Sequence, residues 1–199
     1  MRPDIIRAVD ADSGPRRERA DAARNRARVL AAAERVFAEQ DGRDVTMEQL
    51  AAAAGVGKAT LYRRYPDVAS VALALLDEHE RLIQDRLLHG PPPLGPGAPP
   101  AERLAAFYAA MIALLERHGH LALAAETGGR RYGTGAYRAW QLHVGALLGE
   151  AGLADRPALA DALLAPLAPD VFAHQRASGL TVEEIAADLA TLAHRALGG

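Results

Sequence analysis

Several residues between positions 58 and 65 carry side chains that could recognise a nucleic acid if the segment is helical. At about 100° per residue, one arc of the helix would hold Lys58, Ala59, Tyr62 and Arg63, with Leu61 roughly opposite. The ammonium and guanidinium groups can donate hydrogen bonds to guanine O6 and N7 or to phosphate oxygens. A phenol hydroxyl can donate to a phosphate, and alanine allows close approach or contact with a thymine methyl.

The residues that must position this arc predict two short helices joined by a tight turn. Thr46 is a good N-cap, and Gln49 three residues later completes a capping box. Gly55 can adopt the left-handed conformation that ends a helix, and Pro66 stops the second helix, 58–65. This pattern is that of a helix-turn-helix, so we predict DNA binding. The alternative is an ordinary helical hairpin with a solvated basic face.

The predicted DNA contacts come from the start of the first helix of this pair and from the whole of the second. Tyr62 and Tyr65 are expected to offer hydroxyls to phosphate oxygens, while Lys58 and Arg63 serve bases or phosphates. The full predicted set is Thr46, Gly57, Lys58, Ala59, Thr60, Tyr62, Arg63 and Tyr65.

The segment AAAAGVGKATLYRRYPD resembles the DNA-binding signature of the tetracycline-repressor-like (TetR) family, and the resemblance extends over residues 16–76. Two positions depart from the family pattern. Gly57 replaces the usual serine cap, and Val68 stands where a phosphate-contacting lysine is common. The resemblance implies an all-helical, homodimeric transcription regulator, usually a repressor, in which two late helices of each subunit form a four-helix bundle. An activator would have the same pattern.

Composition and charge fit such a protein. The chain has 199 residues, 50% of them hydrophobic, and no cysteine, so no disulfide framework is possible. No apolar run approaches the roughly 18 residues of a membrane span, and no secretory signal is evident, so we expect a cytoplasmic protein with no membrane partner. Residues 1–65 carry 13 basic against 10 acidic side chains, and residues 66–199 carry 10 against 15. The net charge of -2 therefore combines a basic segment, residues 1–65, with an acidic remainder, and the basic segment contains the predicted DNA-reading helix.

The predicted fold is all-α: an N-terminal three-helix helix-turn-helix domain, then an α-helical ligand-binding and dimerisation domain. We expect a mobile arm over 1–20, the DNA-binding domain over 21–66 and the effector and dimerisation domain over 67–199. The first helix is expected over 22–40, capped near Asp21, and a connector helix capped by Asp67 over 67–89. A Pro/Gly loop covers 90–100. The later helices are expected over 101–118, 121–127, 136–151, 157–178 with restarts at Pro166 and Pro169, and 181–197.

The helices after residue 100 should enclose any effector site. Aromatic, soft or amphipathic side chains there could line a mostly apolar pocket for an unknown small molecule: Tyr108, Met111, Tyr137, Trp140, His143, Phe172 and His174. Each could equally pack in a filled core. Charged side chains near the glycine break, Glu126, Arg130 and Arg131, could gate such a pocket or simply be solvated.

Helices 169–177 and 182–197 are the predicted dimer surface, since reading a palindromic double-stranded operator requires two heads about 34–36 Å apart. The alternative is that their apolar stripe completes the monomer core. No motif for catalysis, a cofactor or a metal appears, so we predict no enzyme, no cofactor and no metal site. Metal sensing through His143 and His174 is a minor alternative. A helical ligand-binding scaffold without operator function is another.

Overall fold

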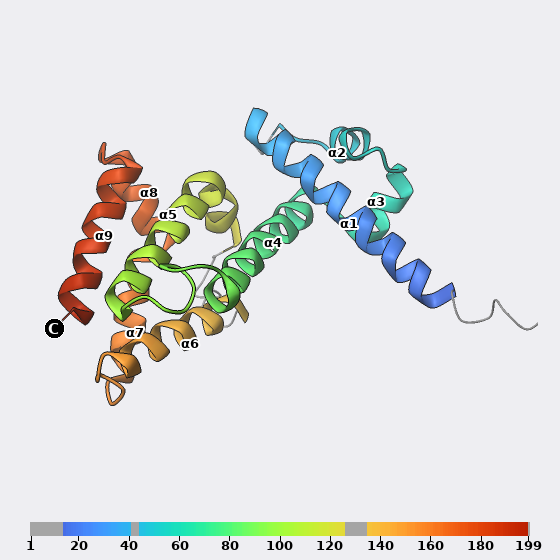
Figure 1. Ribbon diagram of the computed structural model, residues 1–199. Coiled ribbons are helices and arrows are strands. Elements are labelled where there is room, and N and C mark those ends of the chain that lie inside the picture. Colours follow the sequence, from blue (N-terminus) through green and yellow to red (C-terminus); the bar gives the residue numbers. More distant parts are fainter. Residues whose placement is uncertain (1–13, 41–43, 126–134, 199) are drawn as a thin grey trace, which may run out of the picture. The chain divides into compact units, whose positions relative to one another are not determined.

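The computed structural model describes residues 14–40, 44–125 and 135–198, and these are helical with no strand (Figure 1). They form two compact units, 1–71 and 72–199. The predicted all-α fold is confirmed. No helix in the described ranges is long and apolar enough to cross a membrane.

The first unit contains α1 (Gly14–Glu39), α2 (Met47–Ala54) and α3 (Lys58–Arg64), with α2 packed against both of the others. Its core is built from buried apolar side chains on all three helices, among them Leu30, Phe37, Leu50 and Leu61. Burial of these side chains is the main stabilising contribution, because isolated helices of 7 or 8 residues are not stable in water.

Helix α1 begins at Gly14, before the predicted start at Asp21. Pro15 falls in the first turn, where its fixed φ suits a helix start and its missing N–H costs nothing, and the Arg, Glu and Ala residues that follow are good helix formers. The predicted helix start at residue 22 is therefore wrong, while the mobility expected for residues 14–20 stays a prediction. Residues 1–13 lie outside the described ranges.

The second unit is built around α5 (Pro100–Ala125), which packs against α9 (Val182–Leu197), α8 (Pro169–Ala177) and α6 (Gly135–Glu150). In Figure 1, α9 and α8 lie beside α5, and α7 (Pro157–Leu164) lies beside α6. The long helix α4 (Val68–His89) enters this unit at Ala72 and contributes Ile83 and Leu87 to its core.

Helix α5 is continuous where two helices, 101–118 and 121–127, were predicted, so the break at Gly119 is wrong. Glycine ends a helix when it adopts a left-handed conformation, and Gly119 is not among the glycines with positive φ. In a helix interior it costs only about 1 kcal/mol relative to alanine. A Cβ at Gly119 would lie 3.9 Å from Phe172 Cδ1, so packing against α8 accompanies the continuous helix. The predicted break at Gly128, Gly129 and Gly133 lies outside the described residues.

Prolines mark the other boundaries as predicted. Pro157 starts α7, Pro166 lies in a 3-10 turn, η2 (Ala165–Leu167), and Pro169 starts α8. Ala168 is extended, with φ -66° and ψ 132°, as expected for the residue before a proline. The Pro/Gly loop occupies the residues between α4 and α5.

Candidate nucleic-acid interface and ligand cavity

The capping box that starts α2 is formed as predicted. The Gln49 backbone N–H donates to Thr46 Oγ1 at 3.2 Å, and the Thr46 backbone N–H donates to Gln49 Oε1 at 2.8 Å. The Thr46 hydroxyl also donates to Gln49 Oε1 at 3.0 Å. Thr46 is exposed, but its side chain is already used to satisfy the end of the helix, and this competes with the predicted DNA contact.

The turn between α2 and α3 depends on Gly55, which has φ 61° and ψ 38°. The Gly55 N–H donates to the Ala52 carbonyl and the Val56 N–H to the Ala51 carbonyl, each at 3.1 Å, as in a Schellman-type end. Arg28, on α1, donates from Nη2 to the carbonyls of Ala54 at 2.9 Å and Gly55 at 2.7 Å. A guanidinium therefore sits at the negative end of the α2 dipole and holds the turn against α1.

Arg28 was not predicted to have a role. It lies 26 residues before the carbonyl of Ala54, and no local pattern joins the two positions. A three-dimensional contact of this kind has no signal in a single sequence.

Helix α3 is anchored in the core of the first unit by the side chain of Leu61, and its other side chains are exposed to solvent. Leu61 is 1% exposed, whereas Tyr62 is 44% exposed. The other exposed side chains of the helix are Lys58, Ala59, Thr60, Arg63 and Arg64. Gly57 is the N-cap, with φ -66° and ψ 140°, and no side chain caps the helix there. The first N–H groups of α3 thus have no side-chain cap, and helix N-termini of this kind can hydrogen-bond to phosphate oxygens.

Lys58 is close to a carboxylate. Its Nζ lies 3.4 Å from Glu48 Oε1, and both side chains are largely exposed. The backbone N–H of Glu48, and after it the hydrogen bond and charge of Lys58, hold the pKa of that carboxyl below its ordinary value. A phosphate would have to compete with Glu48 for Lys58.

Tyr65 does not present its hydroxyl as predicted. The residue is 5% exposed, and its hydroxyl is buried without a hydrogen-bond partner in the described part of the chain. Tyr65 follows Leu61 by four residues, about one helical turn, so the two side chains lie on the same buried face. That spacing could have predicted the burial. The structure thus buries the hydroxyl that was expected to reach a phosphate, and the phosphate contact of Tyr65 stays a prediction. The ring lies 6.0 Å from the Arg64 guanidinium carbon.

The start of α4 is capped as predicted. Asp67 Oδ1 accepts hydrogen bonds from the Ser70 N–H at 2.7 Å and the Ser70 hydroxyl at 2.6 Å. These two bonds lower the pKa of Asp67. Val68 is half-buried and uncharged, so this position cannot make the phosphate contact that lysine makes in the family pattern.

The second unit contains a cavity of about 480 Å³. It is open to the surface and is lined by α4, α5, α6 and the segment 164–169. Its lining residues are Leu73, Leu76, Asp77, Glu80, Arg81, Gln84, Met111, Leu114, Leu115, His118, Gly135, Ala136, Tyr137, Trp140, Leu164, Leu167 and Pro169. Of the predicted ligand-binding residues, the structure brings Met111, Tyr137 and Trp140 together here.

The other four predicted ligand residues lie elsewhere. Tyr108 is fully buried and donates its hydroxyl to the Leu163 carbonyl at 2.7 Å, and burial raises its pKa. Phe172 is buried against α5, and His174 is exposed on α8. His143 packs edge-on against Phe107 at 5.3 Å, and burial, followed by the charge of Arg103, lowers its pKa to about 4. These side chains pack or are solvated, so they do not line the cavity.

The pocket's polar groups come mainly from α4, which was predicted only to be a connector. Asp77, Glu80, Arg81 and Gln84 follow one another at helical spacings of three, one and three residues, which places them on one face. Arg81 donates to Glu78 at 3.1 Å. Across the cavity, the Tyr137 hydroxyl donates to Asp161 Oδ1 at 2.9 Å, so it is already used in packing α6 against α7.

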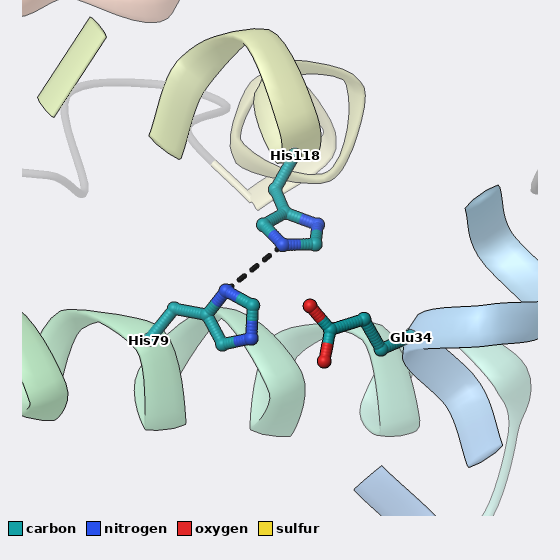
Figure 2. A group of neighbouring side chains, drawn as sticks. All are labelled: Glu34, His79 and His118. Atoms are coloured by element: carbon teal, nitrogen blue, oxygen red, sulfur yellow. Dashed lines mark hydrogen bonds between the residues drawn. The ribbon is translucent and has the colours of Figure 1, made fainter. Parts of the chain in front are cut away.

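His118, on the cavity wall, is hydrogen-bonded to His79 of α4. His118 Nε2 lies 2.9 Å from His79 Nδ1, with the ring centroids 4.5 Å apart and the planes inclined by 73° (Figure 2). One ring must donate and the other accept, so the bond cannot persist with both rings doubly protonated. The pair links α4 to α5, and 39 residues separate the two positions. His143 and His174 belong to no group of three possible metal ligands in the described ranges.

Comparison with known proteins agrees with this architecture. Residues 29–75 match the family model described as "Bacterial regulatory proteins, tetR family". A TetR-like transcriptional regulator from Rhodococcus sp. RHA1 has a similar structure, with a TM-score of 0.56, 21% identity and coverage of 88% of this chain and 96% of that one. The fatty acid degradation regulator FadR from Bacillus halodurans is similar with a TM-score of 0.50, 18% identity and coverage of 88% and 95%. No curated protein sequence matches the chain.

An exposed helix after a capped support helix and a glycine turn is the arrangement of a helix-turn-helix DNA-binding fold. Residues 29–75 match the model of the tetR family of bacterial regulatory proteins, and the fold of the chain is similar to that of TetR-like transcriptional regulators. The resemblance found in the sequence is confirmed. This family consists of regulators, and its members bind DNA and act as dimers.

Proposed function

We propose that this protein is a repressor that binds a palindromic operator as a homodimer and leaves it when a small molecule occupies the cavity of the second unit. The observation that carries the proposal is α3, which is held by Leu61 and exposes Lys58, Tyr62 and Arg63 on the arc expected to enter the major groove. Arg63 is the residue best suited to a bidentate contact with guanine.

Dimerisation is proposed through α8 and α9. One face of α9 completes the core of the second unit with Ile185, Leu189, Ala193 and Leu197. Apolar side chains remain partly exposed on the same hairpin: Val171 at 37%, Leu180 at 36% and Leu192 at 38%. A second copy of the hairpin would cover them. Most of the apolar stripe of α9 therefore packs in the monomer core. We propose that its exposed remainder contacts the second subunit.

Release is proposed to act through α4. Asp67 caps the start of this helix three residues after the end of α3, and the same helix lines the cavity from Leu73 to Gln84. A ligand that binds better to one orientation of α4 than to another shifts the dimer toward that orientation, and the shift cannot exceed its difference in affinity for the two. If the distance between the two DNA-binding units of the dimer no longer matches the spacing of the operator half-sites, only one unit can bind at a time and the affinity falls.

A gel shift with DNA from upstream of the coding region tests operator binding. We expect a sequence-specific shift that Arg63→Ala weakens by about 5-fold to 150-fold, as for loss of a contact worth about 1–3 kcal/mol. The matched control is Arg138→Ala, an exposed arginine on α6, which should bind like the wild type. Equal shifts with operator and unrelated DNA would rule out the operator function.

Dimerisation is tested by light scattering during gel filtration. The measured mass should be twice the chain mass, and Leu192→Asp should lower this mass.

A further inference from the structure

We propose that Glu48 is a specificity-determining residue of the DNA-binding unit: its carboxylate directs Lys58 to the edge of a base pair and keeps it from binding a phosphate. This inference rests on the proposed function, since it concerns how the protein distinguishes its operator from other DNA. Glu48 is not among the residues that the sequence pattern predicted to contact DNA. Both residues belong to the first unit.

The two side chains meet where the two helices of the turn begin. Glu48 lies in the first turn of α2, and Lys58 is the first residue of α3. Lys58 Nζ lies 3.4 Å from Glu48 Oε1, with the side chains 64% and 51% exposed. An ion pair this exposed is weak, so Lys58 remains available to DNA. In a helix-turn-helix the N-terminal residues of the second helix contact base edges, while the first helix crosses the DNA backbone.

Glu48 acts on any anion that approaches Lys58. Its own backbone N–H, and after it the hydrogen bond and charge of Lys58, hold the pKa of this carboxyl below its ordinary value, so it is ionised at neutral pH. A phosphate oxygen bonded to Lys58 at about 2.8 Å would lie no more than roughly 6 Å from Glu48 Oε1. This distance is shorter than the Debye length of about 8 Å at physiological ionic strength, so salt leaves much of the repulsion in place.

The edge of a base pair does not meet this repulsion. A G·C pair is uncharged at its major-groove edge and presents the guanine O6 and N7 acceptors beside the cytosine N4 amino donor. Lys58 can donate to O6 or N7 without bringing an anion next to Glu48, whose carboxylate is itself a suitable acceptor for an N4 amino group. Glu48 thus weakens the phosphate contact and spares the base contact, which raises the ratio of operator binding to binding of unrelated DNA.

Fluorescence anisotropy of the full chain with a labelled duplex of unrelated sequence tests the proposal, in KCl from about 50 to 200 mM. Glu48→Gln removes the charge and keeps the size of the side chain. We expect this variant to bind unrelated DNA about 3-fold to 10-fold more tightly than the wild type. The slope of log K against log salt should steepen by about 0.9 for each phosphate that Lys58 gains. Operator affinity should change by less than about 2-fold, because the base contact is already made.

Two further variants separate this effect from a general change in charge. Glu48→Gln/Lys58→Gln should bind unrelated DNA with the slope of the wild type, since no ammonium is left to take the phosphate. Glu102→Gln is the matched control, because Glu102 is an exposed glutamate in the first turn of α5, in the second unit. It changes the net charge equally and should bind DNA like the wild type. Circular dichroism and thermal melting verify that each variant is folded.

Four results would overturn the inference: unchanged affinity and slope in Glu48→Gln, the same gain in Glu48→Gln/Lys58→Gln or in Glu102→Gln, an equal gain on operator and unrelated DNA, or no binding of unrelated DNA by any variant. The salt dependence on unrelated DNA is measured without an operator. If no sequence is preferred and Glu48→Gln steepens the slope, the operator function fails and the effect of Glu48 on Lys58 stands. If operator binding is specific and the slope does not change, the reverse holds.

Discussion

Replacing Gly55 by alanine should destabilise the turn of the DNA-binding unit by two separable effects. At φ 61° an L-residue with a Cβ is strained by about 1–2 kcal/mol. The new Cβ would also lie 3.0 Å from Arg28 Nη2, closer than normal van der Waals contact. The guanidinium must then move, and its hydrogen bonds to the carbonyls of Ala54 and Gly55 weaken.

The second effect can be estimated from those bonds. Hydrogen bonds to charged groups contribute about 1.5–3 kcal/mol when well formed, and less where water can replace them. One of these two is partly buried and the other exposed, so we expect about 1 kcal/mol in addition to the strain. Gly55→Ala should therefore cost about 2–3 kcal/mol in total.

A double-mutant cycle separates the two effects. In an Arg28→Ala background, Gly55→Ala should cost only the strain, so the two changes together cost about 1 kcal/mol less than their sum. The assay is hydrogen exchange of the amides in α2 and α3, which reports local opening of this unit. Gly152→Ala is the matched control, because Gly152 has φ 77° with no atom within 4 Å of the added Cβ. Exchange of the amides at the end of α6, in the second unit, should therefore report strain alone. Strict additivity at Gly55 and Arg28 would refute the argument.

Three further predictions concern the second unit. Burial lowers the pKa of His143 to about 4 in the folded state, so between about pH 6.5 and pH 4 only the unfolded state binds this proton, and the free energy of unfolding falls as the pH falls. His143→Phe should remove this part of the pH dependence. Chemical denaturation at pH 7 and pH 5 measures it. Thr181→Ala should cost about 1 kcal/mol by removing the α9 cap, seen in urea unfolding. Tyr108→Phe should cost about 1–3 kcal/mol by leaving the Leu163 carbonyl without its buried donor, seen as a lower Tm.

Features set by neighbouring residues could be predicted from the sequence. Both capping boxes, at Thr46 and Thr181, form as expected because the two partners in each are three residues apart. The left-handed Gly55 and the helix start at Pro169 are likewise local. Gly119 shows the limit of this reasoning, since its tendency to end a helix is overcome by the tertiary packing of α5 against α8.

Contacts between residues that are far apart in the sequence could not be predicted. Arg28 reaches the end of α2 across 26 residues, and His79 reaches His118 across 39. For the cavity, the aromatic residues Tyr137 and Trp140 were found by type, but type could not separate them from Tyr108, whose hydroxyl is bonded inside the core. Which side of each helix faces the empty volume is decided by how four helices pack, and no segment encodes it.

The polar face of α4 shows that helical spacing alone does not tell whether a polar stripe meets solvent or a cavity. Asp77, Glu80, Arg81 and Gln84 repeat at helical spacing, and such a stripe normally indicates a solvated surface. Here the same stripe adjoins Leu73 and Leu76 and forms one wall of a cavity whose other walls are apolar. The helix that begins directly after the DNA-binding helices is therefore also a wall of the cavity, and for this reason we propose that occupation of the cavity acts on DNA binding through α4.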